Sequence, residues 1–198
     1  PGVVMVSLPG GNGICTGTVI SHKAVLTAAH CTKTTGRYSV IGGFGTRSTY
    51  DVENHGPGVV DDPNDVSILI FEDNTFSENY IVKIGSGVSD GDTLRLVGFG
   101  CNNLTTRRGA GVKRTGTNVV YDVNEYIEFL TPNSGNARGI LGAENRSGSC
   151  FGDSGGPALK TVGGELVIVG VTHAGGTSGD YIISQYVDVG NRSDNRNF

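Results

Sequence analysis

Short runs of apolar or alternating apolar and polar residues recur along the whole chain, and turn-forming residues separate them. The runs are rich in β-branched residues, and clusters of Gly, Asn, Asp and Pro lie between them, which is typical of strands. Helical character is confined to a short stretch, Ala28–Cys31. The pattern therefore predicts an all-β fold of barrels or sandwiches. The predicted strands are Val3–Leu8, Thr18–Ile20, Ala24–Thr27, Tyr38–Ile41, Val66–Phe71, Thr93–Val97, Asn118–Tyr121, Tyr126–Leu130, Leu166–Val171 and Ile182–Val187.

Composition and length agree with this fold class. The 198 residues include 33 glycines, which favour tight turns over long helices. A chain of this length can bury one large core or two smaller ones, because domains typically have about 100 to 150 residues. The polar stretch Glu72–Asn79 and the turn-rich stretch Gly85–Gly91 are the best candidates for a boundary. We place the boundary between residues 85 and 86.

Charge and cysteine content narrow the class of protein. The net charge of -4 is small and comes without a long run of like charges, which argues against nucleic acid or a membrane surface as a partner. The first residues lack the features of a secretory signal, so we expect a mature, soluble protein. Four widely spaced cysteines do not resemble a zinc site, and an even number indicates disulfides and an extracellular location. We expect no metal and no cofactor, because no such motif is present.

Three segments contain residues suited to catalysis. Gly152–Pro157 places Ser154 in a glycine-rich turn, where a serine can act as a nucleophile if a base takes its proton. An ordinary tight turn explains that segment equally well. His30 follows two alanines and could be the base, and Asp65 begins an apolar strand and could be the carboxylate. Taken singly, each has an ordinary alternative as a surface, core or turn residue. His22 and His55 are interpreted as exposed loop residues without a role.

Together, Thr27–Cys31, Asp65–Leu69 and Gly152–Pro157 resemble, in content and order, the three signatures of the chymotrypsin-like serine proteases. The resemblance covers almost the whole chain. It implies two antiparallel six-stranded β-barrels of the chymotrypsin type with the active site between them. Residues 1–85 would form the barrel that carries His30 and Asp65, and residues 86–198 the barrel that carries Ser154 and the specificity pocket.

The resemblance also implies the chemistry. Ser154 would be the nucleophile, His30 the general base and Asp65 the carboxylate that orients it, while the N–H groups of Gly152 and Ser154 would form the oxyanion hole. The protein would be a secreted, monomeric serine endopeptidase that acts on proteins or peptides and is open to protein inhibitors. A catalytically silent homologue that serves as a binding protein or toxin is the alternative from another class.

The cysteines and Asp153 extend the resemblance. A bond between Cys15 and Cys31 is implied by the family. Cys101 and Cys150 are then left either to bond to each other, which would brace the loop beside the oxyanion hole, or to stay as free thiols. In trypsin-like relatives a freed amino terminus pairs with the acid before the nucleophile, and the first residues here resemble the first strand instead. We therefore expect another cation near Asp153; the candidates are Arg95, Arg107, Arg108 and Arg114.

The predicted specificity pocket contains Gly148, Ser149, His173, Gly176 and Ser184. Gly148 stands where trypsin-like enzymes have an aspartate, so basic substrates are disfavoured. His173 resembles the pocket histidine of glutamyl endopeptidases, which with serine hydroxyls receives a carboxylate. We therefore expect cleavage after Glu or Asp. A pocket for small or apolar side chains is the alternative, because a shift of one residue would turn His173 to the other face of its strand.

Overall fold

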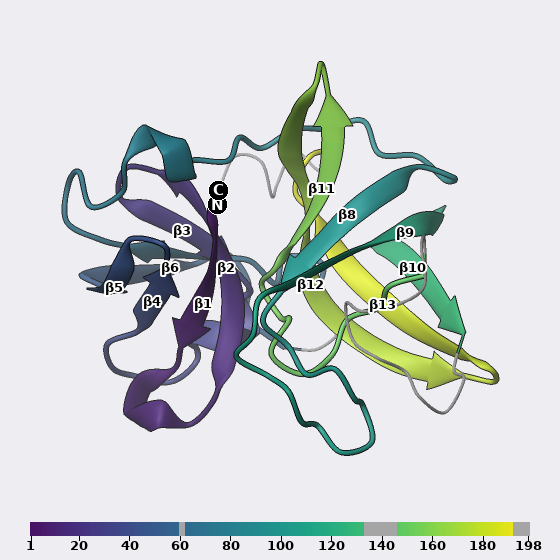
Figure 1. Cartoon of the computed structure of the whole chain (residues 1–198), viewed down its shortest axis with the longest axis horizontal. Helices are drawn as coiled ribbons and strands as arrows, with labels where there is room; N and C mark the ends of the chain where they lie inside the picture. Colours follow the sequence, from purple (N-terminus) through teal and green to yellow (C-terminus); the bar gives the residue numbers. More distant parts are fainter. Residues whose placement is uncertain (60–61, 133–145, 192–198) are drawn as a thin grey trace.

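A computed structural model describes residues 1–59, 62–132 and 146–191 of the chain. Across these residues the regular elements are strands and short 3-10 helices, with no α-helix, so the predicted all-β class is confirmed. In the same ranges no helix is long and apolar enough to cross a membrane. Figure 1 shows two groups of strands side by side, β1 to β6 in purple and blue and β8 to β13 in teal to yellow. The 3-10 helices are η1 (Pro9–Gly11), η2 (Ala29–Thr32) and η3 (Glu78–Tyr80).

The first half of the chain forms a seven-stranded antiparallel sheet in the order β5-β4-β1-β2-β3-β7-β6. The two ends of this order, β5 and β6, are adjacent in sequence, and only Thr49 and Tyr50 connect them. The sheet must therefore curl until its edges nearly meet. Its strands are β1 (Val3–Ser7), β2 (Ile14–Ser21), β3 (Ala24–Thr27), β4 (Ser39–Gly42), β5 (Gly45–Ser48), β6 (Asp51–Asn54) and β7 (Ser67–Ile70).

The connection between β5 and β6 explains why the sheet has seven strands where six were predicted. The N–H of Thr49 donates to the carbonyl of Tyr38, beside β4, and the N–H of Tyr50 donates to the carbonyl of Ile70 in β7. One bent segment thus pairs with β4 at its beginning and with β7 at its end. If β5 and β6 are counted as one bent strand, the curled sheet of the first half has the six strands that the resemblance implied.

The second half forms a closed barrel in the order β10-β13-β12-β11-β8-β9. This is the six-stranded antiparallel barrel that the resemblance implied. Its interior contains buried aliphatic residues and the aromatic pair Phe129 and Tyr186, whose rings meet edge to face. Its strands are β8 (Thr93–Gly98), β9 (Arg114–Val123), β10 (Ile127–Pro132), β11 (Pro157–Val162), β12 (Glu165–Ser178) and β13 (Tyr181–Asp188).

A second apolar cluster joins the two halves. It includes Val4 and Val25 from the sheet together with Phe99, Leu159 and Val171 from the barrel half. Because a buried apolar side chain contributes roughly 1.5 to 3 kcal/mol, such a shared core holds the halves in one relative position. The boundary at residue 85 stays a prediction.

Candidate active site

Two adjacent strands of the sheet bring His30 and Asp65 together. β3 pairs with β7 so that Thr27 lies opposite Ser67, His30 follows β3 on η2, and Asp65 precedes β7. The backbone N–H of His30 donates to Oδ1 of Asp65 at 2.7 Å, and Nδ1 of His30 lies 2.6 Å from Oδ2. An ionised carboxylate can only accept, so Nδ1 of His30 carries a proton, and in the neutral imidazole Nε2 then has the lone pair. This is the state in which an imidazole can act as a base.

Burial differs between the two partners in a way that suits this role. The His30 side chain is 27% exposed and the Asp65 side chain is fully buried. His30 can therefore meet a ligand, whereas Asp65 can act only through its neighbours.

A second histidine contacts the same carboxylate from the barrel. Nδ1 of His173, on β12, lies 2.5 Å from Oδ2 of Asp65, and the His173 side chain is 1% exposed. The pairing of β12 with β13 shifts register between Thr172 and Ala174, which places His173 at a β-bulge. The structure thus gives His173 a partner that the sequence did not suggest. Its role in the specificity pocket stays a prediction.

The two histidines decide the ionisation of Asp65. Burial by itself raises the pKa of this carboxyl group, but the hydrogen bonds from His173 and His30 outweigh burial and hold the pKa below its ordinary value. Asp65 is therefore a carboxylate at neutral pH.

Ser154 lies in a turn that the barrel presents to the sheet. The N–H of Thr16 in β2 donates to the carbonyl of Ser154 at 2.8 Å, and Sγ of Cys31 lies 3.8 Å from the same oxygen. Cys31 directly follows His30, so the serine and the histidine belong to segments in contact. That Oγ of Ser154 reaches Nε2 of His30 stays a prediction.

Gly155 makes this close approach possible. Its φ is +81°, and a Cβ at this position would collide with Oγ1 of Thr27 and with the carbonyl oxygen of Thr16. Only glycine satisfies both the backbone conformation and the space. The glycine after the nucleophile is thus required by packing between the two halves.

Both peptide groups of the predicted oxyanion hole are held by their carbonyls. The Phe151 carbonyl accepts from the N–H of Cys101 at 2.9 Å, and the Asp153 carbonyl accepts from the N–H of Gly156 at 2.8 Å. In a trans peptide the following N–H points the opposite way, so these bonds orient the N–H groups of Gly152 and Ser154. Neither N–H group donates to an acceptor within the described ranges.

Thr16 is a residue that sequence reasoning missed. Its hydroxyl donates to the carbonyl of Gly152 at 2.8 Å and accepts from the N–H of Phe99 at 3.0 Å. With its own N–H bonded to Ser154, this single residue of the sheet contacts the nucleophile turn twice. A threonine next to Cys15 in a predicted turn-to-strand region carried no signal of this role.

Asp153 points away from solvent into the barrel half. Its Oδ1 accepts from the N–H of Gly100 at 2.7 Å and its Oδ2 from the N–H of Cys150 at 2.9 Å. Cβ atoms at Gly98 or Gly100 would collide with the carboxylate, so these glycines make room for it. Burial raises the pKa of Asp153 to about 6, although both N–H groups and the charge of Arg114 lower it.

Of the four arginines considered as partners of Asp153, Arg114 is the one whose charge acts on it. Its guanidinium donates to the carbonyl of Gly100 at 2.9 Å. Arg95, the first candidate from the sequence, is exposed on β8. Arg107 lies over the ring of Phe151 at 4.1 Å. Asp153 was expected to form a direct ion pair. In the structure its carboxylate accepts two backbone hydrogen bonds, and the charge of Arg114 acts on it without a direct contact within the described residues.

The structure contains the disulfides Cys15–Cys31 and Cys101–Cys150. The first ties β2 to the His30 segment. The second braces both backbone groups that donate to the Asp153 carboxylate, because Cys150 is one of these donors and Cys101 directly follows the other, Gly100. No cysteine is free.

Four of the five predicted pocket residues lie near one another. The N–H of Ser149 donates to Oγ of Ser184 at 2.9 Å, and a Cβ at Gly148 would lie 3.4 Å from that Oγ. A Cβ at Gly175, beside the predicted Gly176, would lie 3.6 Å from Oγ of Ser149. His173, as described above, pairs with Asp65 instead.

A further hydroxyl, that of Thr131, borders the same region. It would lie 2.8 Å from a Cβ at Gly148, and sequence reasoning missed it because Thr131 ends an apolar run on β10. The region is therefore lined by hydroxyl groups.

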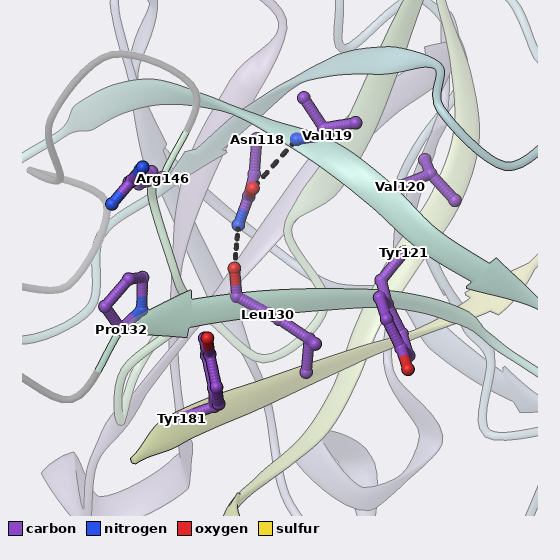
Figure 2. A pocket seen from close by; sticks show the side chains of 8 residues that line it. All are labelled: Asn118, Val119, Val120, Tyr121, Leu130, Pro132, Arg146 and Tyr181. Atoms are coloured by element: carbon purple, nitrogen blue, oxygen red, sulfur yellow. Dashed lines mark hydrogen bonds between the residues drawn. The ribbon is translucent and has the colours of Figure 1, made fainter.

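An open hollow of about 390 Å³ lies elsewhere, on the barrel over β9 and β10. Figure 2 shows Asn118 among the lining residues, with its side chain between the N–H of Val119 and the carbonyl of Leu130. None of the predicted site residues lines it, so it is separate from the candidate active site. Its lining residues are Asn118, Val119, Val120, Tyr121, Leu130, Pro132, Arg146 and Tyr181.

A family model described as Trypsin matches residues 1–193. Among 1020 matching chains of solved structures is one described as "Structure of Glu endopeptidase in complex with MPD", with a TM-score of 0.66 and 17% sequence identity. The match covers 94% of this chain and 85% of that chain, and at this identity it speaks for the fold alone. No curated protein matches the sequence.

Proposed function

The chain belongs to the trypsin family and is a serine endopeptidase, and on that premise we propose that Ser154, His30 and Asp65 form its catalytic triad. The observation that carries the proposal is the double contact between His30 and Asp65. One hydrogen bond holds the backbone of His30 and the other holds its ring through Nδ1, so Nε2 is the ring nitrogen that does not contact the carboxylate. Together the two bonds fix both the position and the orientation of the ring, as a general base requires.

In this mechanism Ser154 attacks the carbonyl of the scissile peptide bond while Nε2 of His30 takes its proton. His30 then protonates the leaving amine, and an acyl group stays on Ser154 until water, activated by the same histidine, releases it. The buried charge of Asp65 stabilises the imidazolium that forms in both steps. Proteins or peptides are the substrates.

The oxyanion hole of the proposal consists of the N–H groups of Gly152 and Ser154. Supporting this, the Phe151 and Asp153 carbonyls are engaged on the opposite side of each peptide. Loss of one such donor typically costs about 3 kcal/mol of transition-state stabilisation.

A fluorophosphonate probe tests the triad, because it reacts only with an activated serine beside a formed oxyanion hole. We expect the protein to be labelled at Ser154. Ser154→Ala should fold normally, resist labelling and lose peptidase activity by several orders of magnitude. Ser48→Ala, which alters an exposed serine on β5, is the matched control and should behave as the unchanged protein. Intact protein that is neither labelled nor active would favour the silent homologue that acts as a binding protein or toxin.

The finer part of the proposal is a preference for Glu, or Asp, before the scissile bond. It is supported by the hydroxyl groups of Ser149, Ser184 and Thr131 around Gly148, since hydroxyls can donate to a carboxylate. The solved structure described as a Glu endopeptidase shows that this fold is compatible with such a preference. Pairing of His173 with Asp65 weakens the part of the prediction that rested on that histidine.

Profiling with a peptide library measures this preference. We expect the highest kcat/KM for peptides with Glu before the cleaved bond. Ser149→Ala should lower that value on the order of tenfold, since a hydrogen bond to a charged group is removed, and should spare peptides with Ala at that position. A profile led by Leu, Phe or Ala would overturn the acidic pocket and establish the small or apolar alternative.

We also propose that the protein is extracellular. Two disulfides are typical of proteins that fold in an oxidising compartment.

A further inference from the structure

Asp65 accepts hydrogen bonds from both halves of the molecule. His30 reaches it from η2 in the sheet half, and His173 reaches it from β12 in the barrel. Both bonds end on Oδ2, and both come from Nδ1 of an imidazole. Since the carboxylate accepts, His173 carries its proton on Nδ1, as His30 does.

The ring of His173 has little freedom to leave this position. Tyr126 stacks on it with a centroid distance of 5.2 Å and an angle of 3° between the ring planes. The side chain is 1% exposed, and the bulge in β12 turns it inward. Its orientation toward Asp65 is therefore built into the barrel.

The residue before His173 holds the nucleophile turn. The carbonyl of Thr172 accepts from the N–H of Gly155, and the N–H of Thr172 donates to the carbonyl of Gly156, each at 2.8 Å. Two consecutive residues of β12 thus contact the turn of Ser154 and the carboxylate of Asp65.

We propose that His173 is a positioning residue of the triad, which fixes Asp65 relative to Ser154 by donating a hydrogen bond across the two halves. The inference rests on the proposed triad. It differs from the pocket role, because here His173 acts through Asp65 on every substrate and not through contact with one kind of side chain.

Two substitutions separate these roles. His173→Phe keeps a ring against Tyr126 and removes the donor, whereas His173→Asn removes the ring and keeps an N–H donor near the place of Nδ1. We expect kcat to fall on the order of 10- to 100-fold in His173→Phe with little change in KM, because a hydrogen bond to a charged group is lost. His173→Asn should retain most of the activity.

The loss should be the same for peptides with Glu, Leu or Ala before the scissile bond. A loss confined to peptides with Glu would overturn the inference in favour of the pocket role. Equal kcat for His173→Phe and the unchanged protein would also overturn it. Failure of the unchanged protein to react with fluorophosphonate would instead defeat the proposed triad, so the two failures are distinguishable.

The pH profile adds a readout that a purely structural role would not move. Among the described residues, the titratable groups that face Asp65 are His30 and His173, with Tyr126 behind His173. Without the second donor, the charge of Asp65 acts more strongly on His30 and favours its protonated form. The acid limb of kcat/KM should therefore move to higher pH in His173→Phe and stay in place in His173→Asn.

A spectroscopic measurement on the unchanged protein keeps the inference testable if His173→Phe does not fold. Nuclear magnetic resonance with ¹⁵N-labelled histidine should show two imidazoles protonated at Nδ1, each with a strongly downfield proton. Detection of His173 without a proton on Nδ1 would contradict the inference.

Discussion

Asp65 and Asp153 are both buried carboxylates of the candidate site, yet their surroundings move the pKa in opposite directions. Asp65 receives hydrogen bonds from two imidazoles and a backbone N–H, which outweigh burial and lower its pKa. Asp153 receives two backbone N–H groups and the more distant charge of Arg114, and burial prevails. The hydrogen bonds from His173 and His30 and the charge of His30 thus outweigh the desolvation of Asp65, whereas the two backbone hydrogen bonds and the charge of Arg114 do not outweigh that of Asp153.

The raised pKa of Asp153 leads to a prediction for stability. Its value is about 6 in the folded protein, against the ordinary value of 3.8, so the folded state holds this proton more tightly than the unfolded state. Between pH 4 and 6 the contribution of Asp153 to the unfolding free energy should therefore fall as pH rises, by about 3 kcal/mol in total, and then level off.

Chemical unfolding of the protein and of Asp153→Asn, each from pH 4 to 7, measures this contribution. The difference between the two free energies isolates Asp153, because the other titrating groups are common to both. The prediction would be wrong if this difference stays constant with pH, or if it grows in favour of the unchanged protein as pH rises. Either result would show that ionisation of Asp153 does not destabilise the folded protein.

At the scale of elements, strand ends and disulfide bonds hold the segments of His30, Asp65 and Ser154 in place. The antiparallel register of β3 and β7 brings His30 to Asp65. Apolar alternation identified most strands, but β5 and β6 were missed because they are exposed edges without an apolar face. β11 was missed because it begins at Pro157, directly after the glycine-rich turn, where the sequence indicates a loop.

The Cys101–Cys150 disulfide supports a prediction of its own. It encloses a separation of 49 residues, against 16 for Cys15–Cys31. Replacing both Cys101 and Cys150 with Ser should lower the unfolding free energy by about 2 to 5 kcal/mol, and by about 1 kcal/mol more than the matched replacement of Cys15 and Cys31.

Its loss should also slow fluorophosphonate labelling of Ser154. Cys101 holds the Phe151 carbonyl, and Cys150 holds Asp153, so both peptides beside the oxyanion hole would loosen. Folded protein that lacks this bond and is labelled at the original rate would refute a role in bracing the loop.

At the scale of the whole molecule, two curled sheets share an apolar cluster, and the candidate site lies where they meet. The shared cluster contains residues from β1 and β3 as well as from β11 and β12. Thr16 and His173 extend this contact to polar groups, since each belongs to one half and donates to a residue of the other. The halves are thus joined at the place where the proposed chemistry needs their relative position to be exact.

The sequence by itself determined the all-β class, the trypsin-type signatures around His30, Asp65 and Ser154, and the even set of cysteines. These features are local: they depend on alternation along a strand, on turn residues and on short motifs. The tertiary structure alone decided the hydrogen-bond partners of Asp153, the two hydrogen bonds from Thr16 to the turn of Ser154, and the orientation of His173. Each joins residues far apart in the chain, and the face that a strand residue presents depends on bulges and register, which no local pattern records.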